Sequence, residues 1–185
     1  MKGIKMSAEK TKKIVSEMEK KVKAFKVHYD VNLEGTINLN EIAKKLGFTI
    51  KEAKFKKGAN HKIISGAISV NNQENEKLIY VNADEPYYRK RFTIAHEIAH
   101  YYLEYKDTEK DIEKIDFRSN MNSNKESELR ANKFAAALLM PKATILALKK
   151  DLNNNLNLIS SIMQVSTKSI KKRFEELSCL ETSSK

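Results

Sequence analysis

The chain has 185 residues, of which 41% are hydrophobic and 32% are charged, a composition that is ordinary for a globular protein with one buried core. No stretch approaches the run of about 18 apolar residues that a membrane span requires, so we expect no membrane segment and a cytoplasmic protein. Cys179 is the only cysteine, which excludes an internal disulfide and a thiolate metal cluster.

The net charge is strongly positive, because 35 Lys and Arg residues stand against 24 Asp and Glu residues and give +11. A positive field of this size favours nucleic acid or an acidic protein as a partner. The excess is spread along the chain and is strongest near the N-terminus, whereas a dedicated nucleic-acid binder usually clusters its charge. Solvated lysine-rich faces therefore account for most of it.

The first helix is predicted from a single apolar stripe. Ser7 is placed to cap this helix, and the stripe recurs at spacings of four, four and three residues through Ile14, Met18, Val22 and Phe25. One apolar stripe on an otherwise lysine-rich helix indicates that this face packs against the rest of the protein.

A second helix and three strands follow. In NLNEIAKKLG, Asn38 is the predicted cap, Glu41 holds the capping-box position and Gly47 ends the helix. The apolar period then changes to alternation at Phe48 and Ile50, and two further apolar runs are ISGAISV and KLIYVN. The segment NNQEN between those runs has turn chemistry, which predicts an antiparallel hairpin.

Helices dominate the remainder. A long one should start near Pro86, with Asp84 or Glu85 as its cap, and run to about Tyr105. Residues 106–125 are polar and are predicted to form a surface loop. The next strong helix covers 126–139 and ends at Pro141, and the last quarter should contain two or three short helices, with LNLISSIM and the segment 166–177 separated by the turn QVS.

The long helix carries the strongest chemical signal, in the segment RFTIAHEIAHYYL. Four residues turn a helix by about 400°, so His96 and His100 project from one side and can converge on a single metal ion. Glu97 is rotated by about 100°, close enough to reach a water molecule beside that ion without binding it. This is the H-E-x-x-H pattern of zinc peptidases, and the apolar flanks indicate a buried helix in which such polar groups need a partner.

The third ligand must come from elsewhere. The metzincin version of the pattern requires Gly at position 103 and His at 106, where this chain has Leu103 and Lys106, and it is excluded. The helix over 126–139 offers Glu126 and Glu128, of which Glu128 lies on the apolar stripe and is preferred. Asn132, one turn later, is predicted to orient one of the histidines through a hydrogen bond without binding the metal itself.

The motifs KRFTIAHEIAH and ELRANKFAAALLMP together resemble the ImmA/IrrE family of metallopeptidases, over residues 38–180. The resemblance implies that His96, His100 and Glu128 bind zinc and that Glu97 is the catalytic glutamate. One departure from the family pattern is Arg130, which stands immediately before the pair Ala131-Asn132, where the family commonly has a glutamate. Position 130 is two residues from Asn132 and therefore lies on another side of the helix.

The expected fold class is α+β, with a mainly helical, gluzincin-like core and a small three-stranded sheet before the histidine helix. We divide the sequence into an N-terminal amphipathic helix (1–33), a metallopeptidase domain (34–148) and a C-terminal helical segment (149–185) that resembles a helix-turn-helix.

The expected activity is peptide hydrolysis with Zn²⁺ as cofactor and Mn²⁺ as the alternative ion, and with Glu97 as general base. Candidate donors to the oxyanion are His61 and the tyrosines near the motif, Tyr87, Tyr88, Tyr101, Tyr102 and Tyr105. The resemblance implies that the substrate is a helix-turn-helix repressor, cut at one place so that a mobile element or a stress operon is released.

Two rival functions stay open at this point. The C-terminal segment carries Lys168, Lys171, Lys172 and Arg173 on its second helix, so the protein could be a DNA-binding regulator with a relict peptidase domain. Against this, the segment has few side chains that read base edges, and Glu175 partly cancels its charge. The other rival is a component of a toxin-antitoxin pair, for which nothing in the sequence argues.

Overall fold

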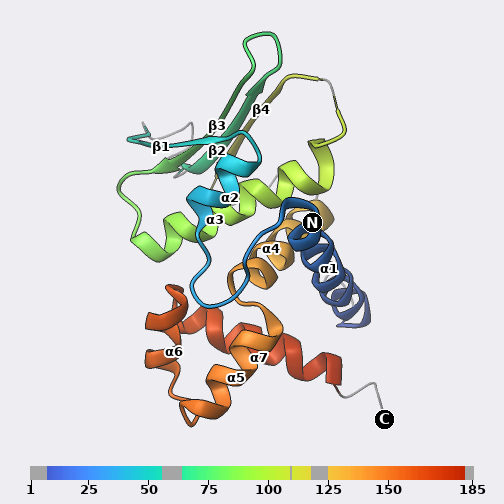
Figure 1. Ribbon diagram of the computed structural model, residues 1–185, viewed down its shortest axis with the longest axis vertical. Helices are drawn as coiled ribbons and strands as arrows, with labels where there is room; N and C mark the ends of the chain where they lie inside the picture. Colours follow the sequence, from blue (N-terminus) through green and yellow to red (C-terminus); the bar gives the residue numbers. More distant parts are fainter. Residues whose placement is uncertain (1–7, 56–63, 109, 118–124, 182–185) are drawn as a thin grey trace, which may run out of the picture.

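The computed structural model describes residues 8–55, 64–108, 110–117 and 125–181 (Figure 1). A small sheet forms one layer, helix α3 crosses beneath it, and the other long helices lie on the far side of α3. The predicted α+β class is confirmed. The elements are α1 (Ala8–Tyr29), α2 (Leu39–Lys45), β1 (Thr49–Ala53), β2 (Ile64–Asn71), β3 (Glu76–Asn82), α3 (Tyr87–His100), the π-helix η2 (Tyr101–Tyr105), β4 (Ile112–Phe117), α4 (Lys125–Leu139), α5 (Lys142–Asp151), α6 (Leu156–Met163) and α7 (Thr167–Glu181).

Helix α1 packs along α4, with its predicted apolar stripe buried between them. The ring of Phe25 meets the ring of Phe134 edge-on, with centroids 5.6 Å apart, and it meets Tyr102 in the same way at 5.0 Å. Edge-on contacts of buried aromatic rings add specificity to the area that they bury. The predicted cap, Ser7, lies outside the described residues.

Helix α2 is formed as local chemistry predicts. The side chain of Asn38 accepts a hydrogen bond from the backbone N–H of Glu41 at 3.2 Å, which satisfies one of the free donors of the first turn. The helix is followed by Gly47 at a φ of +81°, a conformation that side chains with a β carbon rarely adopt. Both predicted ends of this helix are confirmed.

The cap of α3 was predicted wrongly. The residue at the N-cap position is Pro86, which makes no side-chain capping hydrogen bond. The turn before it is held instead by Asn82, whose side chain accepts from the N–H of Asp84 at 3.0 Å and donates to the carbonyl of Ile64 at 2.8 Å. The carboxylate of Glu85 pairs with Arg89 rather than with the helix end. A contact across 18 residues therefore replaces the local cap.

The sheet is mixed, with strand order β1-β3-β2-β4. The predicted hairpin is confirmed, since β2 and β3 pair antiparallel with Ile68 opposite Ile79. Strand β1 joins β3 in parallel, with Ile50 opposite the same Ile79.

Strand β4 contradicts the prediction of a surface loop over 106–125 and of a three-stranded sheet. It pairs antiparallel with β2, with Ile112 opposite Val70. Its sequence, IEKIDF, lacks a clean alternation of apolar and polar residues, and its pairing is made by backbone groups more than 40 residues apart in the chain. The amino-acid composition of a segment does not reveal hydrogen bonds between its backbone and that of a distant strand.

The histidine helix lies directly against the sheet, and Gly66 of β2 permits this close approach. A β carbon at Gly66 would lie 2.4 Å from Cγ2 of Thr93 and 2.8 Å from the carbonyl oxygen of Tyr80, both closer than atoms can pack. Only glycine therefore lets β2 reach α3, and this contact fixes the helix under the strand that carries Gly66.

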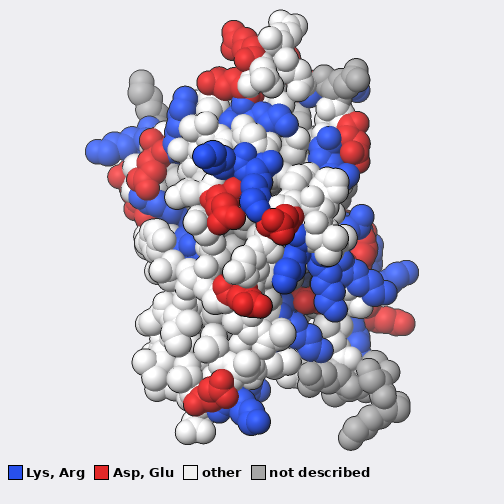
Figure 2. Space-filling view, viewed as in Figure 1, with Lys and Arg blue, Asp and Glu red and all other residues white. Residues whose placement is uncertain are grey.

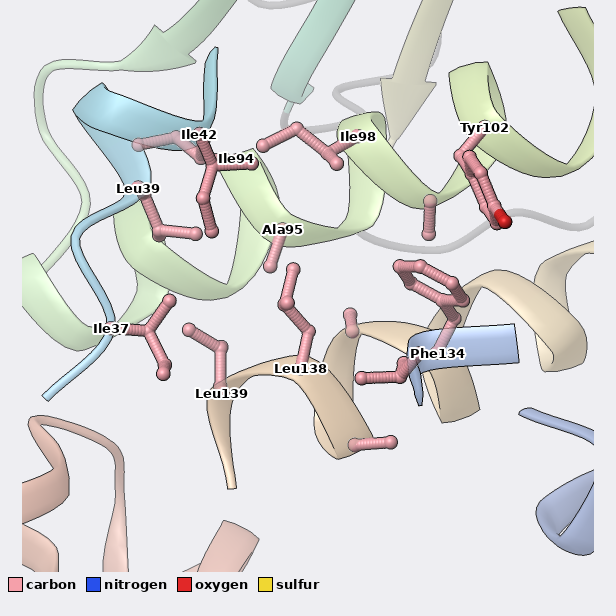
Figure 3. Packing of buried hydrophobic residues seen from close by; sticks show 14 of the residues in the cluster. Ile37, Leu39, Ile42, Ile94, Ala95, Ile98, Tyr102, Phe134, Leu138 and Leu139 are labelled. Carbon is pink, nitrogen blue, oxygen red and sulfur yellow. The ribbon is translucent and has the colours of Figure 1, made fainter. Parts of the chain in front are cut away.

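The other side of α3 faces α4, and side chains from both helices interlock there (Figure 3). Ala95 of α3 is fully buried and points to Leu138 of α4, whereas Ile94 and Ile98 lie on the other side of α3, towards Ile42 of α2. Small residues on α3 let the two helices come close. The packed core between the helices fixes the relative positions of the polar side chains that both helices carry.

The C-terminal helix α7 is tied to the rest by buried ion pairs, of which that of Arg173 reaches two other parts of the chain. Arg173 of α7 is 1% exposed, and its Nε donates to the carbonyl of Met140 at 3.0 Å while its guanidinium pairs with Glu19 of α1 at 2.6 Å. A buried charge is tolerated only with such partners. Helices α6 and α7 are separated by a short turn in which Gln164 is left-handed, as predicted for the turn QVS.

Charge and apolar surface are distributed unevenly on the face in Figure 2. Lys and Arg gather over α1 on the right, whereas the area over α6 on the left is largely uncharged. Leu158 and Ile162 of α6 are 50% and 41% exposed. Within the described ranges no single helix has both the length and the apolar composition to cross a membrane; α4 and α5 meet the test only jointly, and they are bent by 53°.

Candidate metal centre

Helix α3 brings the two histidines of the motif together, as their spacing predicts. The Nε2 atoms of His96 and His100 lie 3.1 Å apart, and the rings are tilted by 81°. Both side chains are buried, His100 completely. Two imidazole nitrogens at this separation point at a common position.

Helix α4 adds a carboxylate at that position. The two carboxylate oxygens of Glu128 lie 3.4 Å from Nε2 of His96 and 3.4 Å from Nε2 of His100. Donors that surround Zn²⁺ tetrahedrally at about 2.0 to 2.2 Å are about 3.3 to 3.6 Å apart. The ligand atoms of these three residues all lie within 4.8 Å of one another, so their spacing fits a single divalent ion.

The other acidic candidate on α4 points elsewhere. Glu126 receives a hydrogen bond from the ammonium of Lys10 on α1 at 2.5 Å, and this bond lowers the pKa of Glu126. Arg130, at the position where the family commonly has a glutamate, pairs with Glu17 of α1. Both side chains thus face α1, and only Glu128 turns to the histidines.

The hydrogen bonding of His100 is the arrangement expected of a ligating histidine. Its Nδ1 lies 3.0 Å from a carboxylate oxygen of Glu104, so Nδ1 carries the proton and donates it. A neutral ring then offers only a lone pair at Nε2, which faces an oxygen of Glu128 that is also an acceptor. Two acceptors face each other stably only when a proton or a metal ion lies between them.

Glu104 was missed at the sequence level. It follows His100 by four residues, within the π-helix η2, and its carboxylate also accepts a hydrogen bond from the hydroxyl of Ser127 on α4. A π-helical turn is frequent at functional sites. The signal that could have found it is the acid one turn after the second histidine, since ligating histidines commonly donate their other N–H to a carboxylate.

The predicted base, Glu97, follows His96 directly on α3 and is not part of the group of three ligand candidates. It is fully buried, and one of its carboxylate oxygens is 3.5 Å from where a β carbon on Gly66 would stand. The contact between α3 and β2 therefore holds this carboxylate against the sheet.

Asn132 lies one turn after Glu128 and lines a cavity next to the centre. Its predicted role in orienting a histidine stays a prediction. Among the tyrosines, Tyr101 accepts a hydrogen bond from Lys77 at 2.8 Å and Tyr87 donates to Gln164 at 3.2 Å. Tyr102 packs in the core against Phe25. His61 lies outside the described residues.

The sequence matches Peptidase_M78, the family described as having an IrrE N-terminal-like domain, over residues 43–175, well over half of the chain. The chain belongs to this family. The resemblance to ImmA/IrrE proteins is thereby confirmed, and the match includes α3 and α4, which carry all three ligand candidates. A search of curated proteins finds no match.

We predict that Glu104→Gln weakens metal binding at this Peptidase_M78 centre by about 10- to 100-fold, because the amide is a weaker acceptor for the Nδ1–H of His100. Competition with a chromophoric chelator measures the affinity. The matched control is Glu126→Gln, an exposed acid bound to Lys10. Equal affinities of Glu104→Gln and wild type would show that Glu104 does not position the ligand.

Proposed function

We propose that the protein is a metal-dependent endopeptidase, in which His96, His100 and Glu128 bind Zn²⁺ and Glu97 is the general base. The observation that carries the proposal is the group of His96, His100 and Glu128 in a chain of the Peptidase_M78 family. The two Nε2 atoms are 3.1 Å apart, and each lies 3.4 Å from one of the two carboxylate oxygens of Glu128. When bound, a Zn²⁺ ion would supply Lewis acidity towards the carbonyl oxygen of a peptide bond and towards water.

The side chains divide the remaining work. Glu97 takes a proton from the attacking water and later delivers it to the leaving amine. The imidazoles of His96 and His100 stay neutral as ligands, and Glu104 holds the tautomer of His100. Packing of α3 between β2 and α4 excludes bulk water, which strengthens every electrostatic interaction in the site.

The choice of Zn²⁺ follows from the donor set. Two imidazoles and one carboxylate, with a coordination position left for substrate, form the set found at catalytic zinc sites. The same donors also accept Mn²⁺, which is the alternative ion.

The proposed substrate is a helix-turn-helix repressor, which the family resemblance implies, and cleavage at one bond would release the genes that it represses. A DNA-binding role for α6 and α7 is the weaker candidate. Its support is the short turn between these helices, but Lys168 and Lys172 of α7 stand at a cavity that is also lined by α3 and α4.

The test mixes the purified protein with the helix-turn-helix repressor encoded nearest to its gene, in the presence of Zn²⁺ or Mn²⁺. We expect two fragments from a single cut, identified by mass spectrometry, and no cut after addition of a chelator. A repressor that stays intact with both ions would remove the support for this substrate. A chelator-resistant cut would contradict the metal-dependent mechanism.

A further inference from the structure

A cavity of about 400 Å³ adjoins the candidate metal centre. It lies between α3, α4 and α7, and its apolar lining is formed by Phe92, Ala136 and Met140. The ring of Phe92 stacks on the ring of His96, with centroids 6.4 Å apart and planes within 27°, so the cavity and the centre share a wall. Among the three ligand candidates, the side chain of Glu128 has the largest exposed fraction, 14%, followed by His96 at 8%, whereas the side chain of His100 is 0% exposed.

The charged groups around this cavity are mostly cations. Three of them already have partners, since Arg89 pairs with Glu85, Lys133 with Glu176 and Arg173 with Glu19. The remaining two are Lys168 and Lys172. Both are exposed, and in the part of the chain that the structure describes neither forms an ion pair.

Lys168 and Lys172 lie four residues apart, so they stand one above the other on the same face of α7. That face turns to the cavity rather than away from the molecule, because Ser169 and Arg173 of the same helix also line it. Two ammonium groups without an anion, over an apolar floor and next to a peptidase-like centre, form a surface complementary to carboxylates.

We propose that this cavity binds an acidic stretch of the polypeptide substrate, adjacent to the bond that is cut; the inference rests on the proposed function. Along α3 the cavity runs from Phe92 to Arg89, about 6 to 10 Å from His96 by helical rise. An extended chain covers about 3.3 to 3.6 Å per residue, so peptide residues that lie over this part of the cavity are about two to three residues from the scissile bond.

An acidic peptide fits better than nucleic acid. A helix that reads duplex DNA must protrude into the major groove, whereas these two lysines, although exposed, stand at a cavity that α3 and α4 also line. The concave, partly apolar floor suits side chains of a single extended polypeptide. Binding of a DNA duplex is therefore the alternative outcome of the test.

The first experiment measures binding without cleavage, in the full-length Glu97→Gln variant loaded with Zn²⁺. Its probes are two fluorescent peptides of identical sequence except that three successive Glu residues in one are Gln in the other. We expect the acidic peptide to bind about fivefold more tightly or better, and the preference to disappear in Lys168→Gln/Lys172→Gln. Salt should weaken the acidic peptide selectively, because exposed charges are screened within about 3 Å at 1 M.

Lys171→Gln is the matched control, since Lys171 is exposed on the same helix and does not line the cavity. It should keep the preference. Thermal unfolding of the double variant verifies its fold. The salt dependence of peptide binding is measured on protein that keeps both lysines, so it tests the same surface without the double variant. Equal binding of both peptides overturns the proposal, as does a double variant that loses affinity for a random DNA duplex while its peptide preference is unchanged.

The second experiment separates this inference from the proposed function. The active protein is given a library of proteome-derived peptides, and the cut sites are read by mass spectrometry. Asp and Glu should be enriched two to three residues from the cut, on one side, and this enrichment should fall in the double variant. Cuts without any preference for nearby acidic residues would contradict the cavity assignment but not the proposed peptidase activity. Lysine-dependent binding of the acidic peptide, together with no cut in either the library or the repressor, contradicts the peptidase proposal and leaves the cavity assignment intact.

Discussion

Glu97→Gln is expected to abolish peptide cleavage, with a loss of about 10²- to 10⁴-fold, while the variant still binds its metal ion and unfolds at an unchanged temperature. A positioned general base contributes an effect of this size, and glutamine has the shape of glutamate but cannot accept the proton. Metal content by mass spectrometry, thermal unfolding and cleavage rate are measured on the same preparation.

This separation of activity from metal binding follows from where Glu97 lies. It is buried against β2 next to Gly66, whereas the donor triangle is formed by His96, His100 and Glu128. A cleavage rate equal to that of wild type would show that another group is the base. Loss of the ion would show instead that Glu97 belongs to the ligand set. The control is again Glu126→Gln, which should cut normally because that side chain faces Lys10.

The features that could be predicted from sequence are those determined within one or two helical turns. Asn38 and Glu41 form a cap because they are three residues apart, and His96 and His100 converge because they are four residues apart. Glu128 was chosen over Glu126 from the phase of α4 alone, and the structure places it 3.4 Å from both histidines.

The features that could not be predicted depend on contacts between distant segments. Strand β4 exists because its backbone pairs with β2, and the start of α3 is held by Asn82 and its bond to Ile64. The hydroxyl of Ser127 reaches Glu104 only after α4 has packed on α3. Local propensity contains no information about such pairings. The residues that contact the ligand candidates from outside therefore could not be predicted from the sequence, whereas the ligand candidates could.

The second large effect is expected for His100→Ala, which should lose the bound ion. It removes one of three donors and opens a completely buried position, so neither water nor a neighbouring side chain replaces the nitrogen in place. His28→Ala is the matched control, because His28 is exposed on α1 and stacks edge-on against Tyr29. Metal content after dialysis should fall from one ion per wild-type chain to none in His100→Ala and stay at one in His28→Ala.

Calorimetry gives an independent measure of the same ligand set. An ion that binds only the folded chain stabilises it by about 4 kcal/mol at a thousand times its Kd, so Zn²⁺ should raise the unfolding temperature of wild type and leave that of His100→Ala unchanged. If the alanine variant fails to fold, Glu128→Gln answers the question, since Glu128 is partly exposed and glutamine preserves its size. A Zn²⁺-dependent rise of equal size in Glu128→Gln would mean that the ion binds elsewhere, because a neutral amide at 128 removes the only carboxylate within the donor triangle.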